Sequence, residues 1–118
     1  MRGKTAIGLT HLRVTLSEDF YLGPGRADLM EGIAETGSIA EAAKGMGMSY
    51  KRAWSLVQAL NEEFGAPLIE TQRGGSGQGA SLTDAGRTVL AAYREMQQAT
   101  RDAIAPSVRA LSDMLRRK

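Results

Sequence analysis

Six hydrogen-bond donors lie within ten consecutive residues near the middle of this 118-residue chain. They are Ser49, Tyr50, Lys51, Arg52, Ser55 and Gln58. Lysine and arginine suit phosphates and guanine edges, glutamine suits adenine, and serine suits a base or a phosphate. Any one of these side chains alone indicates only a solvated polar face. Together they predict a surface that binds nucleic acid.

The two cations stand where a helix optimised for stability would not place them. Ser49 predicts the N-cap of a helix that lasts to Phe64, so Lys51 and Arg52 fall in its first turn. The helix dipole already makes that end positive, and Asp or Glu would be favoured there. The exception costs on the order of a few tenths of a kcal/mol. A phosphate or base edge bound at this end would make the two cations favourable, which indicates a functional site.

A second set of polar residues lies in a glycine-rich segment of the sequence. Arg73, Ser76 and Gln78 alternate with Gly74, Gly75, Gly77 and Gly79, which predicts a hairpin tip. A nucleotide-binding phosphate loop is the alternative, but it needs the lysine and following helix of GxxxxGK[ST]. Both are absent, so the segment favours a wing that lies along a DNA backbone or reaches a minor groove.

Few residues in the chain could support catalysis or metal binding. There is no cysteine and a single histidine, His11, which excludes disulfides, thiolate metal sites and imidazole clusters. We also find no carboxylate pair on an obvious cleft and no histidine paired with an acid. The sequence therefore predicts no enzyme activity, no metal and no cofactor.

The bulk composition is that of an ordinary globular protein. The formal net charge is only +2, so a basic surface for nucleic acid must be local. No apolar run approaches the roughly 18 residues of a membrane span, and no signal-peptide pattern is present. We expect a cytoplasmic, bacterial protein.

The N-terminal third predicts one strand and one helix. Leu9 to Leu16 alternate, with Leu12, Val14 and Leu16 on the buried face and His11 on the side facing solvent. Gly23-Pro24-Gly25 opens a first helix that runs to about Thr36, where Gly37 ends it. Its apolar stripe consists of Leu29, Met30, Ile33 and Ala34.

Two further helices follow around a tight turn. Ser38 and Glu41 fit a capping box, in which the Ser38 hydroxyl and the Glu41 carboxylate each accept the other residue's backbone N–H. This second helix buries Ile39, Ala42, Ala43 and Met46, and Gly47 ends it in the left-handed conformation. The third helix, from Ser49 to Phe64, buries Ala53, Val57, Leu60 and Phe64 with Leu56 beside them. Trp54 flanks that stripe, which favours a core or inter-helix position over a nucleic-acid contact.

The C-terminal part predicts a hairpin and a long helix. Strands are expected at about 68–72 and 80–82, and Thr83 caps the last helix with Asp84 in its first turn. The helix has an apolar stripe of Ala85, Val89, Ala92, Tyr93 and Met96. We expect Pro106 to kink or break it, with a second stripe of Val108, Leu111 and Leu115 beyond.

These elements predict a mainly α fold with a small β-hairpin wing, a winged helix-turn-helix with a long C-terminal dimerisation helix. Residues 1–82 form the DNA-binding domain, and residues 83–118 form the dimerisation helix, kinked near Pro106. A helix over 83–105 would be about 35 Å long, more than one small domain needs. We therefore expect its apolar stripe to bury against a second chain.

The sequence also resembles a known family of regulators. The matching motifs are Gly37-Ser38-Ile39, Ala42-Ala43, Gly47-Met48-Ser49-Tyr50-Lys51, Ala53-Trp54, the glycine-rich loop, Leu82-Thr83 and Gly86. Over residues 9–93 they resemble the N-terminal domain of molybdate-responsive (ModE-type) transcriptional regulators. A looser pattern over residues 37–86 resembles the DNA-binding domain of LysR-type regulators.

The resemblance implies a dimer joined by the first strand region and the long helix. It also implies that the third helix enters the major groove and that residues 73–78 form the wing. The residues that would read the DNA are Ser49, Tyr50, Lys51, Arg52 and Ser55. Molybdate regulators continue into oxyanion-binding domains, and this sequence ends at Lys118. We therefore expect a transcriptional regulator without its own molybdate-binding domain. It would act either autonomously or under the control of a partner protein.

One other function remains open from the sequence. A protein-interaction or dimerisation module could keep this fold without binding DNA, because the last helix would serve either purpose. RNA is a poorer ligand for this surface, since exposed stacking aromatics are few. The target genes, the direction of regulation and the signal have no signature in the sequence.

Overall fold

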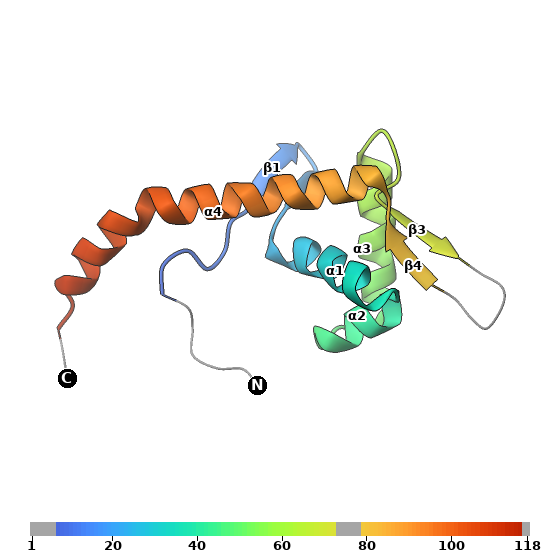
Figure 1. Ribbon diagram of the computed structural model, residues 1–118, viewed down its shortest axis with the longest axis horizontal. Helices are drawn as coiled ribbons and strands as arrows, with labels where there is room; N and C mark the ends of the chain where they lie inside the picture. The colour runs from blue at the N-terminus through green and yellow to red at the C-terminus, as the bar shows by residue number, and fades with distance from the viewer. Residues whose placement is uncertain (1–6, 73–78, 117–118) are drawn as a thin grey trace.

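The structure is a computed structural model that describes residues 7–72 and 79–116 (Figure 1). Eight elements follow one another along the chain: β1 (Val14–Ser17), β2 (Phe20–Leu22), α1 (Pro24–Thr36), α2 (Ile39–Gly45), α3 (Tyr50–Glu63), β3 (Ile69–Gln72), β4 (Gly79–Leu82) and α4 (Asp84–Asp113). The strands form two separate antiparallel hairpins, β1 with β2 and β3 with β4. The fold is the predicted winged helix-turn-helix.

Glycines set the turns between the first three helices, as predicted. Gly37 and Gly47 have φ angles of 75° and 67°, in the left-handed region that glycine adopts without a Cβ penalty. After α2, the N–H of Gly47 donates to the Lys44 carbonyl, and that of Met48 donates to the Ala43 carbonyl, at 3.1 and 2.9 Å. This pair of bonds ends α2 and turns the chain sharply toward α3.

The three predicted N-caps are present. The hydroxyls of Ser38, Ser49 and Thr83 accept hydrogen bonds from backbone N–H groups three residues later, at 3.0–3.1 Å. The second half of the predicted capping box is wrong, because the N–H of Ser38 donates to the Thr36 hydroxyl at 3.2 Å and not to Glu41. The Thr36 hydroxyl also donates to the carbonyls of Gly32 and Ser38, so it already occupies the turn.

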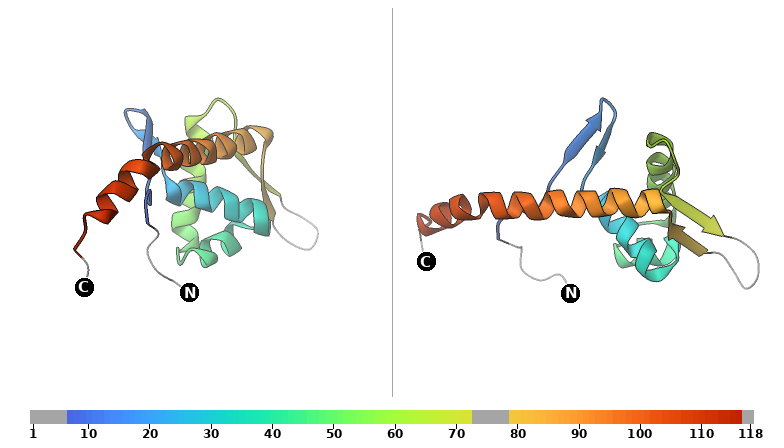
Figure 2. Two further views of the ribbon diagram at one scale, coloured as in Figure 1. Left: turned by 60° about the vertical axis from the view of Figure 1, so that its left-hand side comes forward. Right: turned by 45° about the horizontal axis from the view of Figure 1, so that its top comes forward.

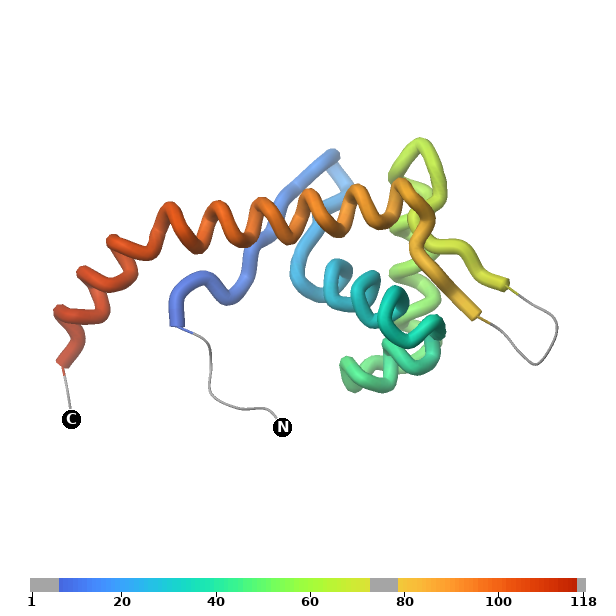
Figure 3. Tube along the Cα trace, in the orientation of Figure 1, coloured from blue at the N-terminus to red at the C-terminus, as the bar shows by residue number. Residues whose placement is uncertain are grey.

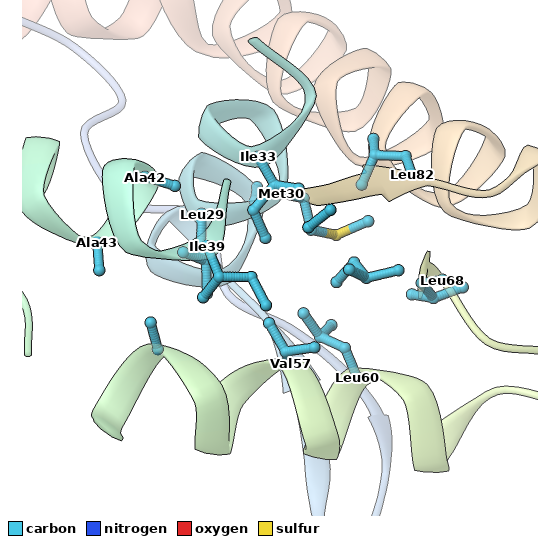
Figure 4. Packing of buried hydrophobic residues seen from close by; sticks show 14 of the residues in the cluster. Leu29, Met30, Ile33, Ile39, Ala42, Ala43, Val57, Leu60, Leu68 and Leu82 are labelled. Atoms are coloured by element: carbon cyan, nitrogen blue, oxygen red, sulfur yellow. The ribbon is translucent and has the colours of Figure 1, made fainter. Parts of the chain in front are cut away.

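The core lies between α1, α2 and α3, and the wing and α4 close its sides (Figure 4). Leu29, Ile33, Val57, Leu60 and Leu68 are at most 1% exposed. The apolar stripes predicted for the three helices account for most of these positions. Two alanines expected on the stripes, Ala34 and Ala92, are exposed because they lie at the stripe edges.

The N-terminal region differs from the single strand predicted over Leu9 to Leu16. Only Val14–Ser17 forms a strand, and it pairs with the unpredicted β2. The register shifts between Thr15 and Ser17, so Leu16 is an extra residue in the ladder and the alternation breaks. Leu16 is therefore 49% exposed, and the prediction that it is buried is wrong. Phe20 supplies the buried contact, with its ring edge-on to Phe64 at 5.8 Å.

The long helix α4 runs unbroken from Asp84 to Asp113, through Pro106. Proline lacks the N–H that would continue the ladder, and Figure 3 shows the helix bending over its C-terminal part. Of the two outcomes expected at Pro106, the break is therefore wrong. No helix in residues 7–72 and 79–116 is long and apolar enough to cross a membrane.

The first half of α4 is fastened to the rest of the domain. Tyr93 is 1% exposed, and its hydroxyl donates to the Leu12 carbonyl at 2.6 Å. Arg94 bridges to Glu31 and Asp28 of α1 at 2.7 and 2.8 Å. The second half extends beyond the domain, which gives the molecule its elongated dimensions of 58 × 32 × 22 Å (Figure 2).

Candidate nucleic-acid interface

The helix α3 and its N-cap residue present the predicted donors to solvent. All six side chains are exposed: Ser49, Tyr50, Lys51, Arg52, Ser55 and Gln58. No acidic residue stands in the first turn of α3, so the positive helix end and the two cations are not neutralised locally. The structure therefore carries these residues on one helix, with five of the six at its N-cap and in its first six residues and Gln58 farther along it.

The opposite face of α3 fixes the direction in which this end points. Ala53, Val57 and Leu60 are at most 1% exposed and pack into the core. The Ser49 hydroxyl accepts the N–H of Arg52 at 3.0 Å, which fixes the first turn and leaves the Arg52 guanidinium free for other contacts. The donors are thus carried by a rigid helix.

Trp54 is not a core residue, but it lies beside the start of α2 and the base of the wing, which agrees with the inter-helix position that the sequence also favoured. Its side chain is 38% exposed, and its ring stacks on that of Tyr50, with centroids 6.4 Å apart and planes 14° apart. One helical turn separates the two residues, so both face the same side of α3. The periodicity placed Trp54 next to the buried stripe but gave no measure of how far α2 and the wing cover it.

Asn61 holds the wing against α3, a role that sequence reasoning missed. Its side-chain oxygen accepts the N–H groups of Leu68 and Ile69 at 2.8 and 3.0 Å, and its amide donates to the Ile69 carbonyl at 3.0 Å. The sequence signal that could have indicated this role is a polar residue three positions after Gln58, on the edge of the buried stripe of α3. Asn61 therefore determines where β3 begins relative to α3.

The base of the wing is also joined to the helix-turn-helix. In the β3–β4 ladder Ile69 pairs with Leu82 and Gln72 with Gly79, and the Ala80 N–H donates to the Gly37 carbonyl at 2.8 Å. The wing base therefore has a fixed position beside the α1–α2 turn. The wing residues predicted to contact DNA, Arg73, Ser76 and Gln78, lie outside the described residues.

A second basic cluster lies on the β1–β2 hairpin and the start of α1. The guanidinium groups of Arg13 and Arg26 lie over the Tyr21 ring, 3.8 and 4.5 Å from its centroid. A hydrogen bond from Arg26 and the positive charges of Arg26, Arg13 and Arg52 lower the pKa of Tyr21. Sequence reasoning missed this cluster, because Tyr21 lies on a strand that it did not predict. His11, predicted to face solvent, is exposed.

The last turns of α4 and the residues directly after it leave apolar side chains uncovered by the rest of the described chain. Leu111, Met114 and Leu115 are 65–79% exposed. Leu111 and Leu115 belong to the second apolar stripe predicted from the sequence, and Val108 of the same stripe is half-buried. Ile7 and Leu9 of the N-terminal segment line a groove together with Ile104 and Val108. This end of the helix therefore has an apolar face without a partner within the described chain.

Comparison with proteins of known sequence places this arrangement among regulators. Residues 27–87 match the family described as "Bacterial regulatory helix-turn-helix protein, lysR family". MopB of Rhodobacter capsulatus, named a molybdenum-pterin-binding protein, is 47% identical over 73 residues, which are 61% of this chain and 27% of that protein. The DNA-binding transcriptional dual regulator ModE of Escherichia coli (strain K12) is 35% identical over 88 residues, 74% of this chain and 34% of ModE. The chain thus spans about a third or less of the length of these relatives.

Solved structures give the same result for the fold. A crystal structure of the CbnR_DBD–DNA complex matches with a TM-score of 0.58 and 26% identity, covering 74% of this chain and 95% of that one. A structure of CbnR, titled a LysR family transcriptional regulator, matches with a TM-score of 0.53 and 28% identity over 70% of this chain and 27% of that one. The family match covers α1, α2, α3 and the wing, which are the elements that build the donor surface. The chain belongs to the lysR family of bacterial regulatory helix-turn-helix proteins.

Proposed function

We propose that this chain is a sequence-specific regulator of transcription that binds double-stranded DNA with α3 in the major groove. The observation that carries the proposal is the exposed set of six donors along α3, a helix whose positive end has no acidic residue in its first turn. A major groove admits one helix and displays a distinct pattern of donors and acceptors for each base pair. The similarity to the CbnR_DBD–DNA complex supports DNA binding by this fold.

The two parts of the surface have different tasks in this proposal. Ser49, Tyr50, Lys51, Arg52, Ser55 and Gln58 contact bases and nearby phosphates, whereas Arg73, Ser76 and Gln78 of the wing contact the DNA backbone. Phosphate contacts set orientation and supply most of the electrostatic affinity, while base contacts supply specificity. Asn61 supports this division because it ties the wing base to the helix that reads the bases.

The proposed active species is a homodimer joined through residues 83–118. No residue in the described part of the chain covers the apolar side chains of Leu111 and Leu115, and apolar surface of this kind is typical of protein interfaces. Helix-turn-helix dimers bind two half-sites about one helical turn of DNA apart. A second copy of this chain would therefore both cover α4 and double the donor surface.

We also propose that residues 1–118 do not by themselves bind molybdate, although several relatives carry molybdenum in their names. Helix N-termini are the anion sites that such a fold offers. Glu41 lies three residues after Ser38, and Asp84 directly follows Thr83, so their charges would repel an oxyanion. The third helix N-terminus, at Ser49, is the one proposed to face DNA. Molybdate or tungstate is expected to leave the melting temperature and the DNA affinity unchanged. Calorimetric binding tighter than about 10 µM, near 7 kcal/mol, would contradict this.

Selection of bound sequences from random duplex DNA tests the proposed function directly. We expect a palindromic site with half-sites about one helical turn apart, and a gel shift whose affinity falls steeply as salt rises. Affinity that does not depend on salt, or the absence of any enriched sequence, would contradict the proposal.

A further inference from the structure

Tyr50 belongs to the proposed donor set through its hydroxyl group, but the stacking of its ring on Trp54 has no role in that set. Tyr50 and Trp54 are the exposed large aromatic side chains among the described residues, at 51% and 38% exposure. Leaving aromatic surface in water forgoes favourable burial, about 25 cal/mol for each Å². A stacked aromatic pair beside a polar donor ridge is therefore expected to be covered when the protein meets its ligand.

The pair forms one wall of a small cavity. The other walls are the start of α2, at Ser38, Ile39 and Ala40, and the base of the wing, at Thr71, Gln72, Gly79 and Ala80. Its volume is about 90 Å³. Small-molecule sites are typically about 300–1,000 Å³, so this cavity suits a projecting group and not a free ligand.

Hydrogen bonds to backbone groups fix these walls before any ligand arrives. Asn61 holds the first residues of β3 against α3, and the Ala80 N–H holds β4 on the Gly37 carbonyl at 2.8 Å. The rings of Tyr50 and Trp54 restrict each other's rotation by stacking, and the helix that carries them is held by its buried opposite face. The cavity is therefore largely preformed, and its aromatic wall belongs to the same helix as the exposed donors Lys51 and Ser55.

The major groove displays one apolar group, the C5-methyl of thymine, among its polar base edges. An apolar wall next to donors is suited to that methyl and gives no compensation to a base that lacks it. We propose that Tyr50 and Trp54 form a contact site for a thymine methyl group and so determine specificity at one base pair of each half-site. This inference rests on the proposed DNA binding by α3.

Replacing thymine by deoxyuridine, one position at a time in the selected site, tests the proposal because only the methyl is removed. At the contacted position the wild-type chain should lose affinity about fourfold, the equivalent of one buried methyl group at about 0.8 kcal/mol. In Trp54→Ala the same replacement should cause no further loss. Gln58→Ala, a variant of the neighbouring exposed donor, should bind more weakly and still respond to the missing methyl.

Trp54 is the single tryptophan of the chain, so its fluorescence reports the contact directly. The thymine duplex should change its emission more than the matched deoxyuridine duplex does at equal saturation. Circular dichroism of Trp54→Ala and Trp54→Phe checks that the fold is kept, and Trp54→Phe should retain part of the methyl response.

Three results separate the outcomes. Salt-dependent binding by the wild type with no methyl-sensitive position would overturn the thymine contact and leave the proposed function standing. If Trp54→Ala binds the thymine and the deoxyuridine duplex more weakly than the wild type by the same factor, the variant still responds to the missing methyl group. Trp54 would then support the wing only and would not contact the methyl group. Absence of any salt-dependent binding by the wild type would overturn the proposed function and this inference together.

Discussion

Among the glycines of the described residues, Gly86 is the one where an added methyl group would meet the closest backbone atom. A Cβ at this residue would lie 2.1 Å from the Leu68 carbonyl oxygen, a backbone atom held in place because it accepts the Thr83 N–H at 2.9 Å. Gly86→Ala must push α4 away from the wing base, and overpacking of this kind costs about 1–3 kcal/mol. We expect a lower melting temperature by circular dichroism.

Gly45→Ala is the matched control for Gly86→Ala. Gly45 is the last residue of α2, and a Cβ there would meet no atom within 4 Å. Alanine in a helix is favoured over glycine by about 0.5–1 kcal/mol, so this variant should melt at or above the wild-type temperature. Equal melting temperatures for the two variants would show that the approach of α4 to Leu68 is not close.

The Tyr93 hydroxyl links the long helix to the N-terminal segment through Leu12. Tyr93→Phe removes that hydrogen bond and should cost about 0.5–1.5 kcal/mol of the free energy of unfolding. Tyr50→Phe, at an exposed ring, should cost less. Denaturant unfolding followed by circular dichroism measures both, and a cost for Tyr93→Phe no larger than for Tyr50→Phe would contradict the role of the bond.

Burial raises the pKa of Tyr93, which gives the same residue a pH signature. Because the folded-state pKa lies above the unfolded value of about 10, the contribution to stability is complete below pH 10 and is lost as the pH rises beyond it. Tyr93→Phe should therefore lose less stability than the wild type between neutral pH and strongly alkaline pH. A parallel loss in both proteins would refute the assignment.

Arg52 is the residue at which base recognition is expected to be concentrated. Its side chain is exposed and its backbone N–H makes the cap, so Arg52→Ala should leave the fold intact. Losing a bidentate base contact costs about 1–3 kcal/mol and should relax base preference at one position. Arg73→Ala should instead weaken all sequences alike and flatten the salt slope by about one unit. Equal losses of both variants on specific and random DNA would argue against separate roles.

At the scale of elements, the helix-turn-helix and the wing act as one unit because Asn61 joins them. Asn61→Ala would leave the N–H groups of Leu68 and Ile69 without their shared acceptor, and an unsatisfied buried donor costs about 1–3 kcal/mol. We expect lower stability and weaker DNA binding, measured by thermal melting and gel shift. Asn61→Asp keeps the acceptor and should recover part of the loss, and no difference between the two variants would exclude the acceptor role.

At the scale of the whole molecule, α4 extends past the domain and carries its exposed apolar face with it (Figure 2). Light scattering at tens of micromolar should give about twice the 12.6 kDa of one chain. Changing Leu111 and Leu115 together to Gln should produce a monomer without lowering the stability of the core, because both side chains are exposed in a single chain.

Trp54→Ala is the control for the dimer, since Trp54 is an exposed apolar residue on α3, outside both the first strand region and α4. It should remain dimeric. A wild-type chain that is monomeric at these concentrations would contradict the dimer, and a dimeric Leu111 and Leu115 double variant would place the interface elsewhere.

The sequence by itself determined the features that depend on neighbouring residues. Gly37 and Gly47 have the positive φ angles that end helices, Ser49 and Thr83 cap α3 and α4, and the period of the apolar residues predicted the three core helices. These features arise within about one turn of chain, where side-chain type and spacing decide the outcome. That is why the fold and the exposed donors of α3 could be predicted.

Only the tertiary structure decided which distant residues meet. Tyr93 reaches Leu12 across 81 positions, and Arg94 reaches Glu31 across 63, so no local pattern encodes either pair. The same reason explains the unpredicted β2 strand, the exposure of Leu16 and the position of Trp54, which depends on how far α2 and the wing cover α3. Periodicity assigns a face to each residue, but the packing of other elements determines whether that face is covered.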